Sequence, residues 1–566
     1  AGGNPFFLRE LVRAQRRGGA FPESVLATVQ ARLDALDAKA RRVLRAASVL
    51  GVRFFEGAVD ALVGAEESRL HVPRLLEALR AEGLVEPVAS RLPGERELRF
   101  GSALVRDACY ATLTEDDRRR GHRLAARWLA EHGEDDAALL ARHLDEAALP
   151  EEAAPRHLEA ARRALAADDL EAVVRHGVRA RRASDPRVAA AAAVLEGEAR
   201  IWAGEQAEAR RAAHFALEAL RSGESAWLDA ACVWLDASAA LGVATGVEAL
   251  AERLVGLTDV DPLDHAQALA RAVPPLVFLE RSALAADVER RATELARGTV
   301  DASLLEARLA NARALRAVME GDLVAATDAF RASAEAFEAA GAARWACSQR
   351  ANLGSKLLEL GRLEAARAEL EAALATAREG PFPYVVALAE LSLGIARHLA
   401  GDHEGALAVE SSSVEAWAGR IGDPRLESAA RSALAEILAA LGRGDDAWTE
   451  ASLAVHQTAG MGPARAAALA VLARLALDDG DAGQALALAE EATALASREP
   501  MLDRELYLAA VLADALVAND RRAEGRRVAA SAWAKLAPSA ARLDPEARAA
   551  FLERVPEHRR LAAHLR

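Results

Sequence analysis

The stretch that decides the fold is residues 353–374, LGSKLLELGRLEAARAELEAAL. Its turn glycine recurs with a period of about forty residues, and an alanine follows each of these glycines five residues later. The glycines are Gly321, Gly361, Gly401, Gly442 and Gly480, and the alanines are Ala326, Ala366, Ala406, Ala447 and Ala485. Asp520 with Gly525, and Gly204 with Ala209, repeat the same step. A fixed period of this length indicates stacked helix pairs rather than one globular core.

The pattern Leu353-Gly354, Gly361, Ala366 and Ala373-Leu374 resembles the tetratricopeptide repeat. Small residues are expected where the two helices of a pair cross closely, and glycine at the turn can end the first helix. The sequence therefore predicts an α-solenoid of about ten tetratricopeptide-like helix pairs over residues 151–540. A generic alanine-rich bundle is the alternative. Pro274-Pro275 should break or kink one first helix, because proline removes backbone hydrogen bonds.

Composition narrows the class of protein. The chain has 566 residues, 52% of them hydrophobic, and a net charge of −14, the sum of +5 over residues 1–130 and −19 over the rest. Its three cysteines, Cys109, Cys232 and Cys347, are far apart, so we expect neither disulfides nor a cysteine zinc site. No apolar run is long enough to span a bilayer, and no signal peptide is visible. We therefore expect a cytoplasmic protein that has no membrane partner and is unsuited to nucleic acid along its acidic part.

The amino-terminal sequence predicts several helices followed by a β-hairpin. Helical spacing occurs after Pro22, over residues 41–50, over 56–63 and over 75–81. Two short alternating runs, 84–88 and 97–100, flank a turn at Pro93-Gly94. Helices followed by such a hairpin favour a winged helix-turn-helix domain. The expected fold class is thus mainly α, with an amino-terminal winged-helix domain and an α-solenoid after it.

Residues 3–11, GNPFFLREL, resemble the end of the nucleotide-binding domain of STAND-class signalling ATPases. Residues 22–51 and 100–122 are similar to the winged-helix domain that follows it in that family, and residues 551–558, FLERVPEH, to the end of bacterial serine/threonine kinases with an ATPase–repeat extension. The resemblance implies a fragment of a longer protein in five parts. These are the end of a nucleotide-binding domain (1–20), a winged-helix regulatory domain (21–113), a helical connector (114–150), the solenoid (151–540) and a capping helix (541–566).

The same resemblance implies where a nucleotide would bind in the longer protein. In the family the Gly-x-Pro turn lies against the adenine of ATP or ADP, which corresponds to Gly3, Asn4 and Pro5 here. A histidine that senses phosphates is replaced by Ser102, which can form hydrogen bonds but carries no charge. A plain helix cap is the other interpretation of Gly3–Pro5.

We expect no catalysis and no cofactor in this chain itself. A P-loop needs a lysine after its glycine-rich turn, and none of Lys39, Lys356 and Lys535 stands in such a loop. The HRD and DFG segments of kinases are also missing. A kinase or nucleotide cyclase could precede the ATPase in the longer protein. His398 and His403 flank a turn, but we expect their rings to point in different directions, as in a solvated turn rather than a metal site.

The main functional hypothesis is a sensor and scaffold arm that binds a protein or peptide and regulates an ATPase domain in cis. In tetratricopeptide proteins the first helix of each pair lines the concave surface, and that register selects eight candidate partner-binding residues. They are Arg308, Asn311, Ser348, Ser355, Glu359, His398, Ser432 and Glu436. The alternative is a transcriptional regulator whose winged helix reads DNA through the helix over Val72–Arg80, although Arg74 and Arg80 are the only basic residues there.

Overall fold

The computed structural model describes residues 25–64, 71–279, 281–297, 303–380, 382–497 and 504–566. Gly3, Asn4 and Pro5, and with them the nucleotide-binding segment expected over residues 1–20, lie outside the described residues. The chain divides into two compact units. We call residues 1–163 with 175–189 the N-terminal unit, and residues 164–174 with 190–566 the repeat unit.

The N-terminal unit contains a small antiparallel sheet among helices. Its elements, in order, are α2 (Val25–Asp34), α3 (Ala38–Leu50), β1 (Arg53–Phe55), α4 (Glu56–Val63), α5 (Val72–Ala81), β2 (Val85–Val88), β3 (Glu97–Phe100), α6 (Ala103–Ala111), α7 (Glu115–Glu131) and α8 (Ala137–Glu146). The strands lie in the order β1-β3-β2, with Arg53 opposite Arg99 and Val85 opposite Phe100. The hairpin that the sequence predicts is therefore present. The third strand, β1, was not predicted, because three residues are too short for a visible alternation.

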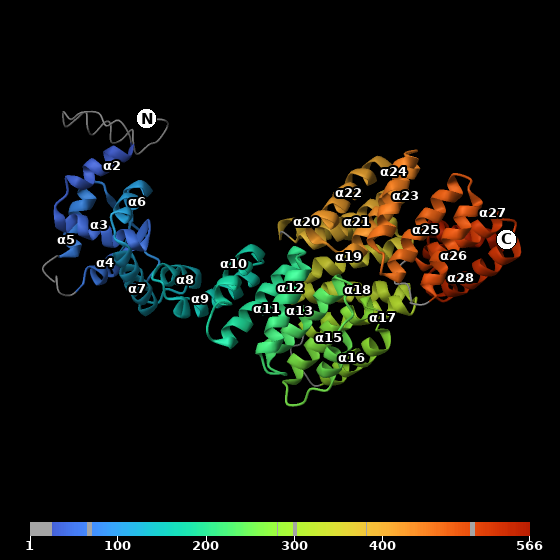
Figure 1. Cartoon of the computed structure of the whole chain (residues 1–566), viewed down its shortest axis with the longest axis horizontal. Coiled ribbons are helices and arrows are strands. Elements are labelled where there is room, and N and C mark those ends of the chain that lie inside the picture. The colour runs from blue at the N-terminus through green and yellow to red at the C-terminus, as the bar shows by residue number, and fades with distance from the viewer. Residues whose placement is uncertain (1–24, 65–70, 280, 298–302, 381, 498–503) are drawn as a thin grey trace. The chain divides into compact units, whose positions relative to one another are not determined.

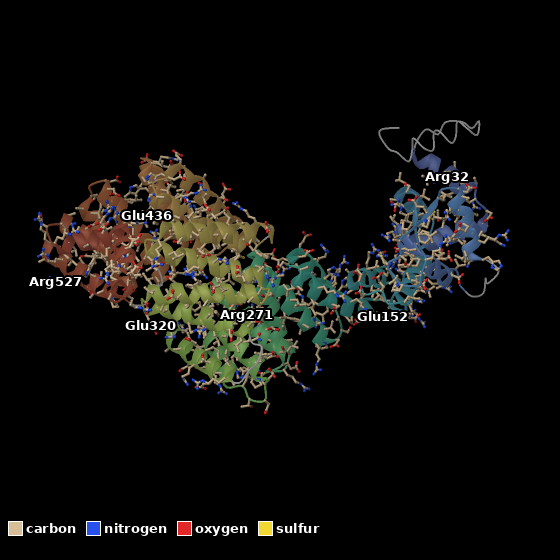
Figure 2. The ribbon with its side chains drawn as sticks, turned by 180° about the vertical axis from the view of Figure 1, so that it is seen from behind. Arg32, Glu152, Arg271, Glu320, Glu436 and Arg527 are labelled. Atoms are coloured by element: carbon tan, nitrogen blue, oxygen red, sulfur yellow. The ribbon has the colours of Figure 1, made fainter. Side chains whose placement is uncertain are left out.

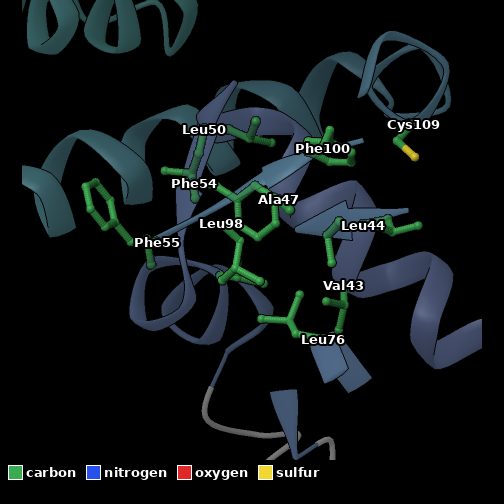
Figure 3. Close-up of a cluster of buried hydrophobic side chains, with 14 of the residues drawn as sticks. Val43, Leu44, Ala47, Leu50, Phe54, Phe55, Leu76, Leu98, Phe100 and Cys109 are labelled. Atoms are coloured by element: carbon green, nitrogen blue, oxygen red, sulfur yellow. The ribbon is translucent and has the colours of Figure 1, made fainter. Parts of the chain in front are cut away.

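The core of this unit forms between α3, α5 and the sheet (Figure 3). The rings of Phe54 and Phe100 lie 5.2 Å apart, and Leu44 and Leu76 are fully buried. Trp128 of α7 packs against Phe55 with 5.6 Å between ring centroids. The segment expected as a connector thus contributes to the core of the N-terminal unit. A winged-helix identity for residues 21–113 stays a prediction.

Helices alone make up the rest of the described chain (Figure 1). They are α9 (Pro150–Ala166), α10 (Leu170–Ala180), α11 (Pro186–Ala203), α12 (Gln206–Ala219), α13 (Ser225–Ala240), α14 (Val247–Val255), α15 (Pro262–Phe278), α16 (Ser282–Ala296), α17 (Ser303–Met319), α18 (Leu323–Ala339), α19 (Ala343–Glu359), α20 (Leu363–Glu379), α21 (Pro383–Leu399), α22 (His403–Ala416), the π-helical η2 (Trp417–Ile421), α23 (Pro424–Ala440), α24 (Gly444–Gln457), α25 (Gly462–Asp478), α26 (Ala482–Ala496), α27 (Glu505–Ala518), α28 (Arg522–Arg542), α29 (Pro545–Glu553) and α30 (Pro556–Leu565).

The predicted repeat geometry is confirmed at the turns and crossings. Gly361 has φ of +70° and lies in the turn between α19 and α20. In this turn the Arg362 N–H donates to the Leu357 carbonyl at 2.9 Å. Asp520 takes the same left-handed conformation, with φ of +59°, in the repeat that lacks a turn glycine. At the crossing, a methyl group on Gly354 would lie 2.5 Å from Leu370 Cγ. Only glycine lets these two helices approach so closely. The repeat unit is therefore built from tetratricopeptide-like helix pairs.

Two expectations for the repeats are wrong. Pro274 and Pro275 do not break α15, which continues to Phe278. Each removes one backbone N–H donor near the end of the helix, but the packing of α15 against α13, α16 and α17 keeps the helix continuous. The segment 541–566 is not one capping helix, since α28 extends to Arg542 and both α29 and α30 follow. Val555 is extended because the following Pro556 disfavours the helical conformation at the residue before it. This extended residue separates α29 from α30.

Helix pairs far apart in sequence contact each other through their turns. A methyl group on Gly204 would lie 2.7 Å from the Cα of Ile421, and one on Gly361 would lie 2.6 Å from the Ala550 carbonyl oxygen. Ser539 Oγ donates to the Gly321 carbonyl at 3.2 Å across 218 residues. The solenoid thus coils until one turn rests on the next, and the carboxy-terminal helices α28 and α29 close it against α18 and α20.

Candidate functional site

The candidate site is a cavity of about 1190 Å³ inside the repeat unit. The first helices of successive pairs line it, namely α15, α17, α19, α21, α23 and α25, together with parts of α28 and α30. The stacking of the pairs turns the first helices toward the interior, while second helices such as α20 and α22 lie outside. The second helix α18 also reaches the cavity, through Leu323, Phe330 and Phe337. All eight candidate partner-binding residues line this one cavity: Arg308, Asn311, Ser348, Ser355, Glu359, His398, Ser432 and Glu436. Their role in binding stays a prediction.

The cavity wall changes character from helix to helix. On α17 and α19 it carries neutral polar side chains, Asn311, Ser348, Asn352 and Ser355 among them. On α21 it becomes apolar, with Tyr384, Leu388, Leu391 and Ile395. Trp202 and Trp345 add an aromatic corner, with ring centroids 4.8 Å apart and planes at 88°. Such a mixture of convergent polar groups and apolar wall is typical of ligand-binding cavities.

Buried ion pairs fix the ionic part of the wall. Arg271 on α15, labelled in Figure 2, is only 9% exposed. It bonds Glu198 at 2.6 Å and Asp236 at 2.9 Å. Burial raises the pKa of Asp236 to about 6, although Arg271 acts in the opposite direction. Arg504 bonds Glu436 at 2.5 Å. Burial alone would raise the pKa of Glu436, but Arg504 outweighs it and holds this pKa below its usual value. These carboxylates therefore already have partners.

The two histidines beside the turn of the α21–α22 pair contact each other, contrary to expectation. His403 Nδ1 lies 3.2 Å from His398 Nδ1. The rings meet because His398, in the last turn of α21, and His403, at the start of α22, lie on the same side of the turn. Burial lowers the pKa of His398, with Glu436 opposing it, so the imidazole lining the cavity is neutral at pH 7. Within the described ranges, no three metal-ligating side chains come together.

The residue singled out in the N-terminal unit has a structural role. Ser102 is the N-cap of α6, and its hydroxyl accepts a hydrogen bond from the Leu104 backbone N–H at 3.2 Å. An N-cap serine satisfies one of the free donors at a helix start. We expect Ser102→Ala to lower the stability of α6 by about 1 kcal/mol, measured as faster hydrogen exchange of its amides. Ser102→Asp, which keeps the cap, should exchange like the native chain, and equal exchange in both variants would contradict this role.

The helix expected to read DNA presents little free positive charge. On α5, Glu77 bonds Arg80 at 3.2 Å and also pairs with Arg96. These arginines lower the pKa of Glu77, first through the hydrogen bond from Arg96. Arg74 is exposed on the same helix. The face thus carries its own counter-charge, which does not favour binding to phosphates.

Two histidine pairs in the N-terminal unit, one buried and one partly buried, were not expected from the sequence. His122 Nδ1 and His143 Nδ1 lie 2.8 Å apart, and His122 Nε2 contacts the Tyr110 hydroxyl at 2.8 Å. Burial lowers the pKa of His122 to about 4 and that of His143 to about 3. One neutral ring donates and the other accepts. His157 and His176 repeat the contact at 2.8 Å. No sequence signal marks such pairs, because their members are 19 and 21 residues apart on different helices.

The cavity also has lining residues that the repeat register did not select. Asn352 lies one turn after Ser348 on α19, so extending the register would have found it. Lys535, Glu557 and Arg560 come from α28 and α30. They reach the cavity only because the carboxy-terminal helices fold back against the solenoid, and no local pattern encodes that contact.

Comparison with known proteins gives structural likenesses only. No family model matches the chain, and no curated protein matches it. A Rap protein complexed with competence and sporulation factor aligns with 66% of this chain and 99% of its own, at 14% identity and a TM-score of 0.40. A STAND protein with a tetratricopeptide repeat sensor from Pyrococcus horikoshii aligns with 87% of this chain and 67% of its own, at 12% identity and a TM-score of 0.37.

A third structure, the APC/C hetero-tetramer Cut9–Hcn1, aligns with 82% of this chain and 88% of its own, at 11% identity and a TM-score of 0.40. All three TM-scores are below 0.5, so the function has to be argued from this chain's own residues. In the described part of the chain, no helix combines the length and apolarity that crossing a bilayer requires.

Proposed function

We propose that this chain is a non-catalytic binding arm whose repeat unit holds a segment of a protein or peptide in the central cavity. The observation that carries the proposal is the convergence of polar side chains from five or more first helices on one cavity of about 1190 Å³. An extended peptide offers a backbone donor and acceptor at every residue. The neutral polar groups of α17 and α19 suit that backbone, and the apolar wall of α21 suits side chains.

Blocking the cavity tests this function. Ser355 lines the cavity on α19, whereas Ala368 is exposed on α20, outside it. We expect the full chain to enrich peptides from a random-sequence library, and Ser355→Arg to lower their affinity at least tenfold by occupying the space. Ala368→Arg adds the same side chain outside the cavity and should leave the affinity unchanged. Equal losses in both variants, or none in Ser355→Arg, would exclude the cavity as the site.

A regulatory role in a longer signalling protein is the further part of the proposal. It rests on the resemblance of residues 3–11 and 100–125 to STAND-class ATPases. There, Gly3, Asn4, Pro5 and Ser102 would adjoin ATP or ADP, and the arm would regulate the upstream ATPase and any kinase domain in cis. A partner can shift such an equilibrium only through a difference in its affinity for the two states. ATP turnover of the longer protein that does not change when partner is added would refute this part.

A further inference from the structure

Two arginines of the cavity wall differ from the other cations there. Arg271, Arg281, Arg425, Arg504, Lys356 and Lys535 each have a carboxylate partner. Among the described residues, Arg308 and Arg560 have none within ion-pair distance. Arg308 Nη1 donates instead to the amide oxygen of Gln267 at 3.1 Å. A neutral amide supplies no counter-charge to this guanidinium, and the nearby carboxylates of Glu198 and Asp229 compensate its charge only in part.

The surroundings of Arg308 make that charge unfavourable. Arg308 is half-buried on α17, next to the cation of Arg271 on α15. Burial and the neighbouring Arg271 lower the pKa of Arg308, while Glu198 and Asp229 offset this only in part. Glu198 is already bonded to Arg271. An anion in direct contact with Arg308 would stabilise its charged form, against the repulsion of the nearby carboxylates Glu198, Asp229 and Asp236.

The residues next to Arg308 indicate what kind of anion fits. Asn311 lies one turn further along α17, and Ser348, Asn352 and Ser355 follow on α19. These side chains are uncharged and can both donate and accept hydrogen bonds, as a peptide backbone requires. The planar guanidinium matches a carboxylate through two parallel hydrogen bonds. Beyond them, Leu388 and Ile395 on α21 offer an apolar surface for a neighbouring side chain.

We propose that Arg308 selects partners with an acidic group, binding a carboxylate of an extended peptide whose backbone lies along Asn311 and Asn352. This inference rests on the proposed peptide-binding function and adds the chemistry of the ligand. The chain as a whole carries a net charge of −14, which repels acidic peptides at long range. Preference for an acidic ligand would therefore come from this local cation and not from the overall field.

The test compares peptides that the full chain and its Arg308→Gln variant enrich from the same random-sequence library. We expect the native chain to enrich peptides containing aspartate or glutamate, and Arg308→Gln to bind those peptides at least tenfold more weakly. The matched control is Arg313→Gln, an exposed arginine of the same helix outside the cavity wall, which should bind them like the native chain. Arg308→Gln removes the repulsion from Arg271 but also the hydrogen bond to Gln267, so its unfolding temperature is measured beside that of the native chain to show that lost binding does not reflect unfolding.

Different outcomes would contradict the preference for acidic peptides and the proposed peptide binding itself. Peptides that bind in the cavity without acidic enrichment, or whose affinity survives Arg308→Gln, would overturn the acidic preference and leave peptide binding standing. Enrichment of no peptide at all would overturn both. Inorganic phosphate that binds native chain but not Arg308→Gln, without any acidic peptide binding, would show a small-anion site and contradict the peptide ligand.

Discussion

Gly361→Ala is expected to destabilise the repeat unit by about 2–4 kcal/mol, because the new methyl group strikes the backbone of the next superhelical turn. It would lie 2.6 Å from the Ala550 carbonyl oxygen and 2.9 Å from the Ala550 carbonyl carbon. Backbone atoms cannot rotate away as a side chain can, so α29 must move. Thermal unfolding of the full chain measures the loss of stability. Hydrogen exchange over residues 545–566 shows whether the loss is located at α29 and α30.

Gly442→Ala is the matched control for this variant. Gly442 has φ of +76°, close to the +70° of Gly361, and nothing lies within 4 Å of the methyl group it would gain. It therefore bears only the conformational cost of alanine in the left-handed region, about 1–2 kcal/mol. Equal destabilisation by the two variants would show that α29 does not rest on the turn at Gly361 and that the solenoid is open there.

Glu410→Leu is expected to stabilise the repeat unit by about 2–4 kcal/mol. Glu410 on α22 is fully buried, and neither of its carboxyl oxygens has a hydrogen-bond partner in the described structure. It lies over Gly394 as Leu370 lies over Gly354 in the preceding repeat, so leucine has a suitable place. Chemical denaturation of the full chain should show the higher free energy of unfolding. A lower free energy of unfolding would mean that the Glu410 carboxyl stabilises the native chain.

The stabilisation of the repeat unit by Glu410→Leu should increase as pH rises. Burial raises the pKa of Glu410 well above its ordinary value, with Arg504 opposing in part. Between the ordinary pKa, about 4.3, and the raised one, the folded chain holds a proton that the unfolded chain has lost. Stability therefore falls as pH rises through that window, and the advantage of Glu410→Leu grows. The reverse substitution in the neighbouring repeat, Leu370→Glu, should destabilise the chain over the same window.

The local elements of the repeat could be predicted from sequence because they depend on short-range chemistry. Glycine in the left-handed region ends a helix at Gly361, and a small residue permits the crossing at Gly354. The helix and hairpin pattern of the N-terminal unit was visible for the same reason. The sequence did not predict the three-residue strand β1 or the continuation of α15 through Pro275. In both, tertiary packing outweighs the local preference.

The site was predictable as far as the repeat register reaches. Counting along first helices placed Arg308, Ser355 and Glu436 on the cavity wall without any knowledge of the fold. The same counting could not show which cations are neutralised, because the partners come from other helices. Glu198 and Arg271, for instance, are 73 residues apart. Nor could it show that Arg560 of α30 returns to the cavity, since closure of the solenoid is a long-range event.

The central claim is that a partner lies inside the solenoid, against its first helices. Hydrogen exchange of the full chain with and without a library-selected peptide tests it most directly. We predict slower exchange of amides on α17, α19 and α23 in the presence of peptide, and little change on α20 and α22, which contribute no residue to the cavity wall. Protection confined to α20, α22 or the N-terminal unit would place the partner outside the cavity and contradict the claim.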